Sequence, residues 1–259
     1  MDQQRRHLLK SSAAVGFGAA LPAAAQAQSV MFAREGSYIP IAGTDQKFQV
    51  RRIYCVGRNY AAHAREMGSD PNREPPFFFQ KPTDAIQLVP AGATVDHPYP
   101  PMTKNYHYEV ELVAALGKGG RNIPQDKALE CVYAYAVGLD MTRRDLQRAM
   151  GDEKKPWEVG KSFDRSAVIS YLHPATKTGA MTKGAIWLKV NGQIKQQGDL
   201  SQQIWSVPEQ ISYLSNLITL QPGDLIFSGT PAGVGPVVGG DKLEGHVDGV
   251  GDLKFGYRK

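Results

Sequence analysis

The sequence has few cysteines and no arrangement of cysteine and histidine that is typical of a metal or redox site. Its 259 residues include only two cysteines, Cys55 and Cys131, and both lie in apolar runs. Neither belongs to a Cys-x-x-Cys pair, which argues against the common zinc and thiol–disulfide motifs. We expect both to be buried free thiols.

Three further absences narrow the class of function. The apolar run over residues 13–25 is far shorter than the ~20 residues of a membrane-spanning helix. The net charge of +5 is dispersed, which argues against nucleic acid as a partner. The glycine-rich stretch 230–240 lacks the Gly-Lys-Ser/Thr of a phosphate-binding loop. We therefore expect no stable membrane anchoring, no nucleic acid and no bound nucleotide.

Residues 1–27 have the layout of a bacterial secretory signal, with a basic start, a mildly apolar run and Ala-Gln-Ala at the end. The Arg5-Arg6 pair resembles the twin-arginine type of signal, whose pathway carries folded proteins. This pathway would suit a protein that acquires a metal while it folds in the cytoplasm. We expect cleavage near Ala27 and a periplasmic product. Its net charge would be +3, because the segment carries three basic residues and one acidic residue.

The remaining pattern predicts one β-rich domain of the α+β class over residues 51–259, preceded by a lead-in over 28–50 with one hairpin. Apolar and aromatic runs predict strands, and amphipathic runs predict helices over 59–68, 123–132 and 206–218. The expected strands cover residues 52–57, 77–82, 106–117, 133–142 and 225–229. Asn191-Gly192 predicts the turn of a hairpin over 185–198.

Glu109 and Glu111 lie two residues apart in the expected strand 106–117, so their side chains share a face. Spacing alone favours a solvated face over a bound cation. Asp140 ends the apolar run 133–140, where a carboxylate needs a partner or caps a following helix. Together the three form an all-oxygen set that suits Mg²⁺, Mn²⁺ or Ca²⁺.

His63 and Glu66 are three residues apart on an expected helix, where a carboxylate beside an imidazole makes a general base for water. Spacing alone favours a surface helix on which the two residues never meet a ligand. Four basic and amide side chains could each bind a carboxylate or stabilise an oxyanion. Each could equally be a surface residue. The four are Arg144, Gln147, Lys161 and Lys81.

Seven motifs occur in an order that resembles the catalytic domain of the fumarylacetoacetate hydrolase family. They are VGRNYAAHAREMG, FFQKP, YEVELV, GLDMTRRDLQ, WEVGKSFD, VNGQIKQQGDLSQQIWSVPEQISYLS and LQPGDLIFSGTPAGVG. The resemblance covers roughly residues 51–257, and within the family it is nearest to the acylpyruvases. It implies a mixed β-sandwich roll and a homodimer.

The resemblance also implies the roles of individual residues. It makes Glu109, Glu111 and Asp140 the ligands of one Mg²⁺ or Mn²⁺ ion, and His63, Glu66 and Lys161 the catalytic groups. Arg144, Gln147 and Thr230 match substrate contacts, and less specific motifs add Lys81 and Arg58. Arg143 departs from the family pattern, where many relatives have a small residue. The export signal is a second departure, since the relatives in question are cytosolic.

The activity implied is metal-dependent hydrolysis of the C–C bond of a 2,4-dioxo acid similar to fumarylpyruvate, giving a carboxylic acid and pyruvate. Two alternatives use the same site, namely decarboxylation of oxaloacetate and isomerisation of a 2-oxo diacid. A third, of another class, is a periplasmic protein that binds oxo acids without turnover. His63, Glu66 and Lys161 argue against it, because binding alone would not need them.

Overall fold

Two long strands, β8 (Val110–Leu116) and β9 (Val132–Asp140), pair antiparallel in the middle of a mixed eight-stranded sheet. The computed structural model describes residues 31–32, 35–68, 74–90, 92–93 and 95–257, and from Gly36 onward the chain forms one unit. The expected signal segment 1–27 lies outside the described residues. Within the described part of the chain, no helix is long and apolar enough to cross a membrane.

The large sheet has the order β4-β3-β15-β8-β9-β11-β5, with β12 also paired to β9. Its other strands are β3 (Arg52–Val56), β4 (Phe78–Lys81), β5 (Ile86–Leu88), β11 (Ala167–Ile169), β12 (His173–Pro174) and β15 (Asp224–Phe227). The β3–β15 and β5–β11 pairs are parallel and the rest are antiparallel. A mixed sheet agrees with the predicted roll.

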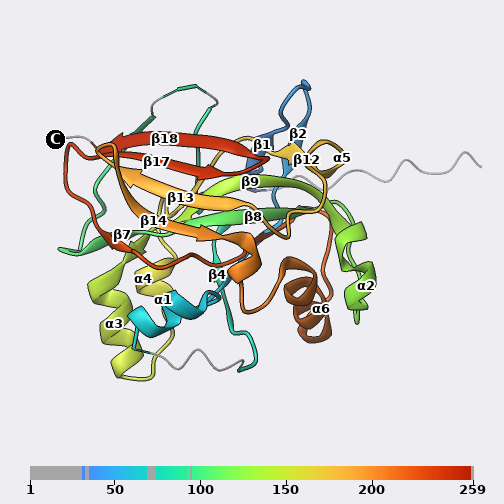
Figure 1. Cartoon of the computed structure of the whole chain (residues 1–259), viewed down its shortest axis with the longest axis horizontal. Helices are drawn as coiled ribbons and strands as arrows, with labels where there is room; N and C mark the ends of the chain where they lie inside the picture. Colours follow the sequence, from blue (N-terminus) through green and yellow to red (C-terminus); the bar gives the residue numbers. More distant parts are fainter. Residues whose placement is uncertain (1–30, 33–34, 69–73, 91, 94, 258–259) are drawn as a thin grey trace, which may run out of the picture. The chain divides into compact units, whose positions relative to one another are not determined.

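A second sheet of five strands, in the order β14-β13-β17-β18-β6, packs over one face of the first (Figure 1). Its strands are β6 (Val95–His97), β13 (Ala185–Val190), β14 (Gln193–Asp199), β17 (Lys242–Val247) and β18 (Gly251–Tyr257). Leu112 and Val137 of the large sheet share one buried cluster with Leu188 and Phe255 of the second. The predicted sandwich and the hairpin turn at residues 191–192 are thus confirmed.

The opposite face of the large sheet carries a second cluster. Strand residues next to those of the first cluster, such as Val113 and Ala136, point to this side. Ile39 covers them from the predicted hairpin of β1 (Tyr38–Pro40) and β2 (Lys47–Gln49).

The chain over residues 106–117 differs from its prediction as one strand. It forms β7 (Tyr106–Tyr108), which pairs with β10 (Thr142–Arg143) and β16 (Gly235–Pro236), and then β8 in the large sheet. Glu109 lies at the break between the two ladders. Because buried residues continue through both strands, the apolar pattern alone carries no sign of the change of sheet.

Helices α1 (Ala61–Glu66), α3 (Arg144–Asp152) and α4 (Glu158–Lys161) gather at one end of the sandwich (Figure 1). Gly68 follows α1 with a φ of +75°, as expected of a residue that ends a helix. The other helices are α2 (Gln125–Ala128), α5 (Ala175–Thr178) and α6 (Val207–Leu217), with 3₁₀ turns at Thr83–Ala85, Leu129–Cys131 and Leu200–Gln202.

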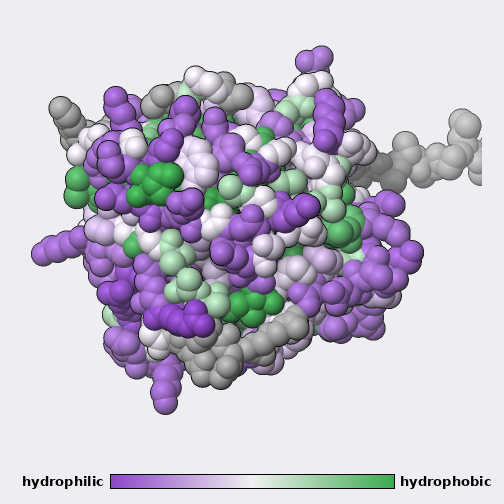
Figure 2. All heavy atoms as spheres, in the orientation of Figure 1, coloured by the Kyte–Doolittle hydropathy of each residue, from purple (hydrophilic) through white to green (hydrophobic). Residues whose placement is uncertain are grey.

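The surface and the core differ in the expected way. Hydrophilic side chains predominate on the face shown in Figure 2, and hydrophobic ones form small separate groups. Cys55 and Cys131 are both free and buried, as predicted.

Candidate active site

Three carboxylates meet where β7, β8 and β9 come together. Glu109 follows β7, Glu111 lies in β8 and Asp140 ends β9. The backbone N–H of Asp140 donates to the carbonyl oxygen of Glu109 at 2.9 Å, so the strand pairing holds these residues opposite each other. One oxygen of each carboxylate lies within 4.8 Å of the others, and all three residues are buried.

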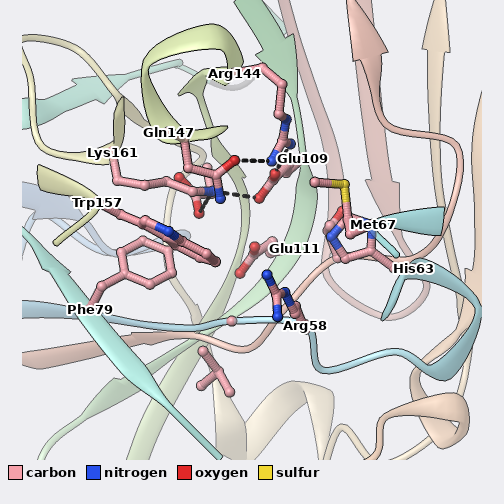
Figure 3. Close-up of a pocket in the computed structure, with 14 residues that line it drawn as sticks. Arg58, His63, Met67, Phe79, Glu109, Glu111, Arg144, Gln147, Trp157 and Lys161 are labelled. Carbon is pink, nitrogen blue, oxygen red and sulfur yellow. Dashed lines mark hydrogen bonds and ion pairs between the residues drawn. The ribbon is translucent and has the colours of Figure 1, made fainter. Parts of the chain in front are cut away.

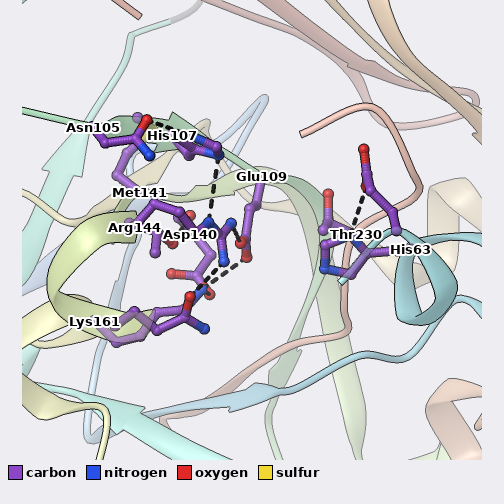
Figure 4. A network of polar contacts seen from close by, with 12 residues as sticks. His63, Asn105, His107, Glu109, Asp140, Met141, Arg144, Lys161 and Thr230 are labelled. Carbon is purple, nitrogen blue, oxygen red and sulfur yellow. Dashed lines mark hydrogen bonds and ion pairs between the residues drawn. The ribbon is translucent and has the colours of Figure 1, made fainter. Parts of the chain in front are cut away.

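Three cations compensate this buried negative charge, and Figure 4 shows two of them, Lys161 and Arg144. Lys161 of α4 donates to Glu109 Oε2 at 2.8 Å and to Asp140 Oδ2 at 2.7 Å. Lys81, the last residue of β4, lies 2.8 Å from Asp140 Oδ1. Arg144, the first residue of α3, donates to Glu109 Oε1. Buried charges are tolerated when they are paired in this way.

Glu111 has a different environment. It accepts a hydrogen bond from Gly229 N–H at 2.8 Å, and no Lys or Arg among the described residues forms an ion pair with it. Burial and the charges of Asp140 and Glu109 raise the pKa of Glu111 well above its usual range. Burial acts on Glu109 in the same direction, but Lys161 and Arg144 hold its pKa below the usual range.

His63 and Glu66 form the expected pair on α1. His63 Nδ1 lies 3.1 Å from Glu66 Oε2, and Gly233 N–H donates to both oxygens of the same carboxylate. Although burial acts to raise it, the pKa of Glu66 is lowered by the hydrogen bonds from His63 and Gly233. An ionised Glu66 can only accept, so neutral His63 carries its proton on Nδ1 and keeps the lone pair of Nε2 free.

A narrow pocket of about 20 Å³ connects the two groups of side chains (Figure 3). The triad, His63 and Lys161 line it together with four other residues predicted from sequence, Arg58, Arg144, Gln147 and Thr230. In the view of Figure 3, Trp157 and Phe79 lie on one side of Glu111, with Met67 and His63 on the other. The lining of the pocket is therefore mostly polar and charged, with Phe79, Trp157 and Met67 among its apolar members.

Comparison with known proteins identifies the family. The family model described as "Fumarylacetoacetate (FAA) hydrolase C-terminal" matches residues 52–256. The chain belongs to the fumarylacetoacetate hydrolase family. The match spans the two stacked sheets and all residues of the site.

The relatives of this family member include enzymes with different names. A fumarylpyruvate hydrolase of Ralstonia sp. is 48% identical over 72% of this chain and 94% of its own length. The mitochondrial oxaloacetate tautomerase of Mus musculus is 43% identical over 81% of this chain and 92% of its own. A crystal structure of fumarylpyruvate hydrolase from Pseudomonas aeruginosa, in complex with Mn²⁺ and pyruvate, is 56% identical, with a TM-score of 0.87 over 89% of this chain and 99% of that one.

The carboxylate triad of this family member fits a divalent cation. Oxygen donors at this spacing suit Mg²⁺ or Mn²⁺, which prefer carboxylate ligands. Glu111 supports the assignment most directly, because its buried carboxylate has no ion-pair partner among the described residues. The solvated face that spacing alone favoured for Glu109 and Glu111 is not found, because both are buried.

Two residues predicted to act on substrate or water lie behind the pocket wall. Lys81 is buried against Asp140 and donates to the carbonyl oxygens of Met141 and Lys161, so it holds the triad in place. Glu66 contacts the pocket only through His63. The alternative of a helix cap for Asp140 is wrong, because α3 begins at residue 144 and Asp140 is tied to lysines.

Arg143, which departs from the family pattern, also lies outside the pocket lining. Its guanidinium carbon lies 4.2 Å from the centre of the Phe163 ring. Its size therefore affects the packing beside β10 rather than the shape of the pocket.

Gln196 supports Thr230 of the pocket, and the sequence did not single it out. Its side-chain oxygen accepts from Val110 N–H, and its amide nitrogen donates to Pro231 O and to Thr230 Oγ1, each at 2.8 Å. Thr230 Oγ1 is thus an acceptor toward Gln196, which leaves its own proton for a group in the pocket. Gln196 lies on β14, far from the other site residues in sequence, and its environment appears only in the fold.

Removing the charge of Glu111 should abolish metal binding while keeping the fold. We expect 1 mM Mn²⁺ to raise the melting temperature of the wild-type protein by roughly 5–10 °C, given an excess of about 100 over the dissociation constant. Glu111→Gln should lose this rise, because one of three ligand charges is gone, whereas no ion pair is broken.

Differential scanning fluorimetry with and without the ion measures the effect. The matched control is Glu158→Gln, which removes the same charge from an exposed position near the pocket. A full Mn²⁺-dependent rise in Glu111→Gln would contradict the triad as the metal site.

Proposed function

We propose that the protein hydrolyses the C–C bond of a 2,4-dioxo acid similar to fumarylpyruvate, giving a carboxylic acid and pyruvate. The observation that carries this is the position of His63, Lys161 and the triad around one pocket. The fumarylpyruvate hydrolases among the relatives support it, one of them at 56% identity with Mn²⁺ and pyruvate bound.

The triad would hold one Mg²⁺ or Mn²⁺ ion per active site. When bound, such an ion acts as a Lewis acid that stabilises the negative charge developing on the oxygens of the dioxo acid. The residues of the chain have the remaining tasks of orienting the substrate and moving the proton.

His63 is the group that activates water. Its free Nε2 takes a proton from a water molecule, and the ionised Glu66 stabilises the resulting imidazolium. Gly233 N–H keeps Glu66 in place, so the imidazole does not need to reorient during the reaction. The hydroxide equivalent adds to C4 of the dioxo acid.

Lys161 and Gln147 stabilise the oxygens of the substrate. Two of the three ammonium protons of Lys161 are used by Glu109 and Asp140, and the third is free for the pocket. Gln147 Oε1 accepts from Arg144 at 2.6 Å, so its amide N–H groups are the donors toward the ligand. Such fixed donors favour developing oxyanions.

The bond between C3 and C4 then breaks. Its electron pair passes to C3 as the enolate of pyruvate, and C4 leaves as the carboxylic acid. Return of the proton from His63 to C3 gives pyruvate, so one water molecule is consumed for each bond cleaved.

A second candidate, chemistry on oxaloacetate, is favoured by the oxaloacetate tautomerase at 43% identity. Decarboxylation would pass through the enolate of pyruvate and isomerisation through the enolate of the intact diacid, and neither consumes water. Product analysis separates the candidates: hydrolysis yields pyruvate from fumarylpyruvate, whereas decarboxylation yields CO₂ from oxaloacetate. Binding without turnover is disfavoured, because the pairing of His63 with Glu66 fixes a free basic nitrogen that binding does not need.

Replacing His63 should affect turnover more than binding. We expect His63→Ala to lower kcat roughly 100- to 10,000-fold, the usual contribution of a general base. The KM should change only a few-fold, because the imidazole acts on water.

Steady-state kinetics with a 2,4-dioxo acid measures this, with His173→Gln on strand β12 as the matched control. Full kcat in His63→Ala would remove the pair from the mechanism.

We propose that the protein is exported in folded form to the periplasm. The Arg5-Arg6 pair and the Ala-Gln-Ala sequence at residues 25–27 support this. Changing Arg5-Arg6 to Lys-Lys should leave most of the protein in the cytoplasm, as measured by fractionation and immunoblotting. Undiminished export would contradict the twin-arginine route.

We also propose a homodimer, which the resemblance to the family supports. Sedimentation equilibrium of the mature protein should give twice the mass of one chain. A fully active species with the mass of a single chain would contradict it.

A further inference from the structure

The narrow pocket opens into a second, larger cavity. This outer cavity has a volume of about 570 Å³ and shares Arg58, Met67, Gln147 and Trp157 with the narrow pocket. A substrate whose 2-oxo acid group lies at the triad therefore has one continuous path outward, past Met67 and Trp157. The outer cavity, at about 570 Å³, has room for an acyl group that extends beyond the narrow pocket.

Arg58 lies where the two cavities join. Its φ of +55° is a left-handed conformation that is uncommon outside glycine and often occurs at functional sites. The preceding Gly57 is in contact with Phe77, since a Cβ at this position would lie 2.0 Å from the ring. The backbone is thus held close to Phe77, and this position brings the Arg58 side chain to the opening.

The guanidinium of Arg58 is held by aromatic rings rather than by a carboxylate. Its central carbon lies 5.5 Å from the ring centre of Trp157 and 5.9 Å from that of Phe77. No ion pair links it to a carboxylate of the described residues. Its hydrogen-bond donors are therefore available to an anion in the cavity.

The other charged groups of the outer cavity do not replace Arg58. Glu66 is occupied by His63 and Gly233, and Arg148 and Asp152 line only the outer cavity. Among the described residues, Arg58 is thus the one cation that lines both cavities.

We propose that Arg58 binds a second carboxylate, at the distal end of the acyl group, and so makes the enzyme selective for dicarboxylic 2,4-dioxo acids. The inference rests on the proposed function. An unsaturated acyl chain would lie between the apolar side chains of Met67 and Trp157, with its terminal carboxylate at the guanidinium. An acyl group without that carboxylate gains nothing from Arg58.

The test compares two substrates that differ at this end, fumarylpyruvate and acetylpyruvate. We expect Arg58→Gln to lower kcat/KM for fumarylpyruvate by about 10- to 100-fold, mainly through KM, as for loss of one charge-assisted hydrogen-bonded pair. The loss for acetylpyruvate should be at least about fivefold smaller, because that substrate lacks the distal carboxylate. Arg58→Lys should recover part of the loss, because it keeps the charge but not the two-pronged geometry.

Arg65→Gln is the matched control, because Arg65 loses the same charge on α1 but lines neither cavity. Equal losses on both substrates, or no loss on either, would overturn the role of Arg58 while leaving the hydrolase intact. Failure of the wild-type protein to cleave either substrate would overturn the proposed function, and this inference with it. Melting temperatures of the variants show whether a loss reflects misfolding.

Discussion

The bridge that Lys161 makes between Glu109 and Asp140 is the interaction on which the rest of the site depends. Two carboxylates, one between β7 and β8 and one at the end of β9, lie buried at the same point, and without a shared cation their repulsion would drive them apart. The bridge requires α4 to lie very close to α3. Gly160 allows this, because a Cβ there would lie 2.7 Å from the backbone of Gln147. The close approach also brings Gln147 to the same pocket.

The pairing of β8 with β9 determines where the carboxylates lie relative to one another. Val110 lies opposite Leu139 and Glu111 opposite Gly138, which places Asp140 beside Glu109. A slip of one residue would turn both glutamates toward the opposite face and bring apolar side chains into the pocket. The core clusters on both faces of the sheet prevent that slip. The metal site is therefore specified by hydrophobic packing as much as by its own charges.

Local features of the site could be predicted from the sequence, whereas contacts over long separations could not. The spacing of Glu109 and Glu111, and of His63 and Glu66, follows from strand and helix geometry. The support of Glu66 by Gly233 joins residues 167 positions apart, and nothing in either segment indicates it. Lys81 was expected to contact the substrate. From sequence alone, a lysine that contacts a substrate cannot be distinguished from one that pairs with a buried carboxylate. Only the fold shows that Asp140 lies between it and the pocket.

The charges of the narrow pocket favour an anionic head group when a metal is bound. Three carboxylates and three cations balance one another, so a bound divalent ion leaves an excess of positive charge that favours an anionic 2-oxo acid. Relatives named as hydrolase and as tautomerase both match this chain across the segment that carries these groups. We infer that the triad and its cations bind the oxo acid group, and that residues farther out distinguish one oxo acid from another. The residues of helix α1 and of the outer cavity are therefore the candidates for determining which oxo acid is bound.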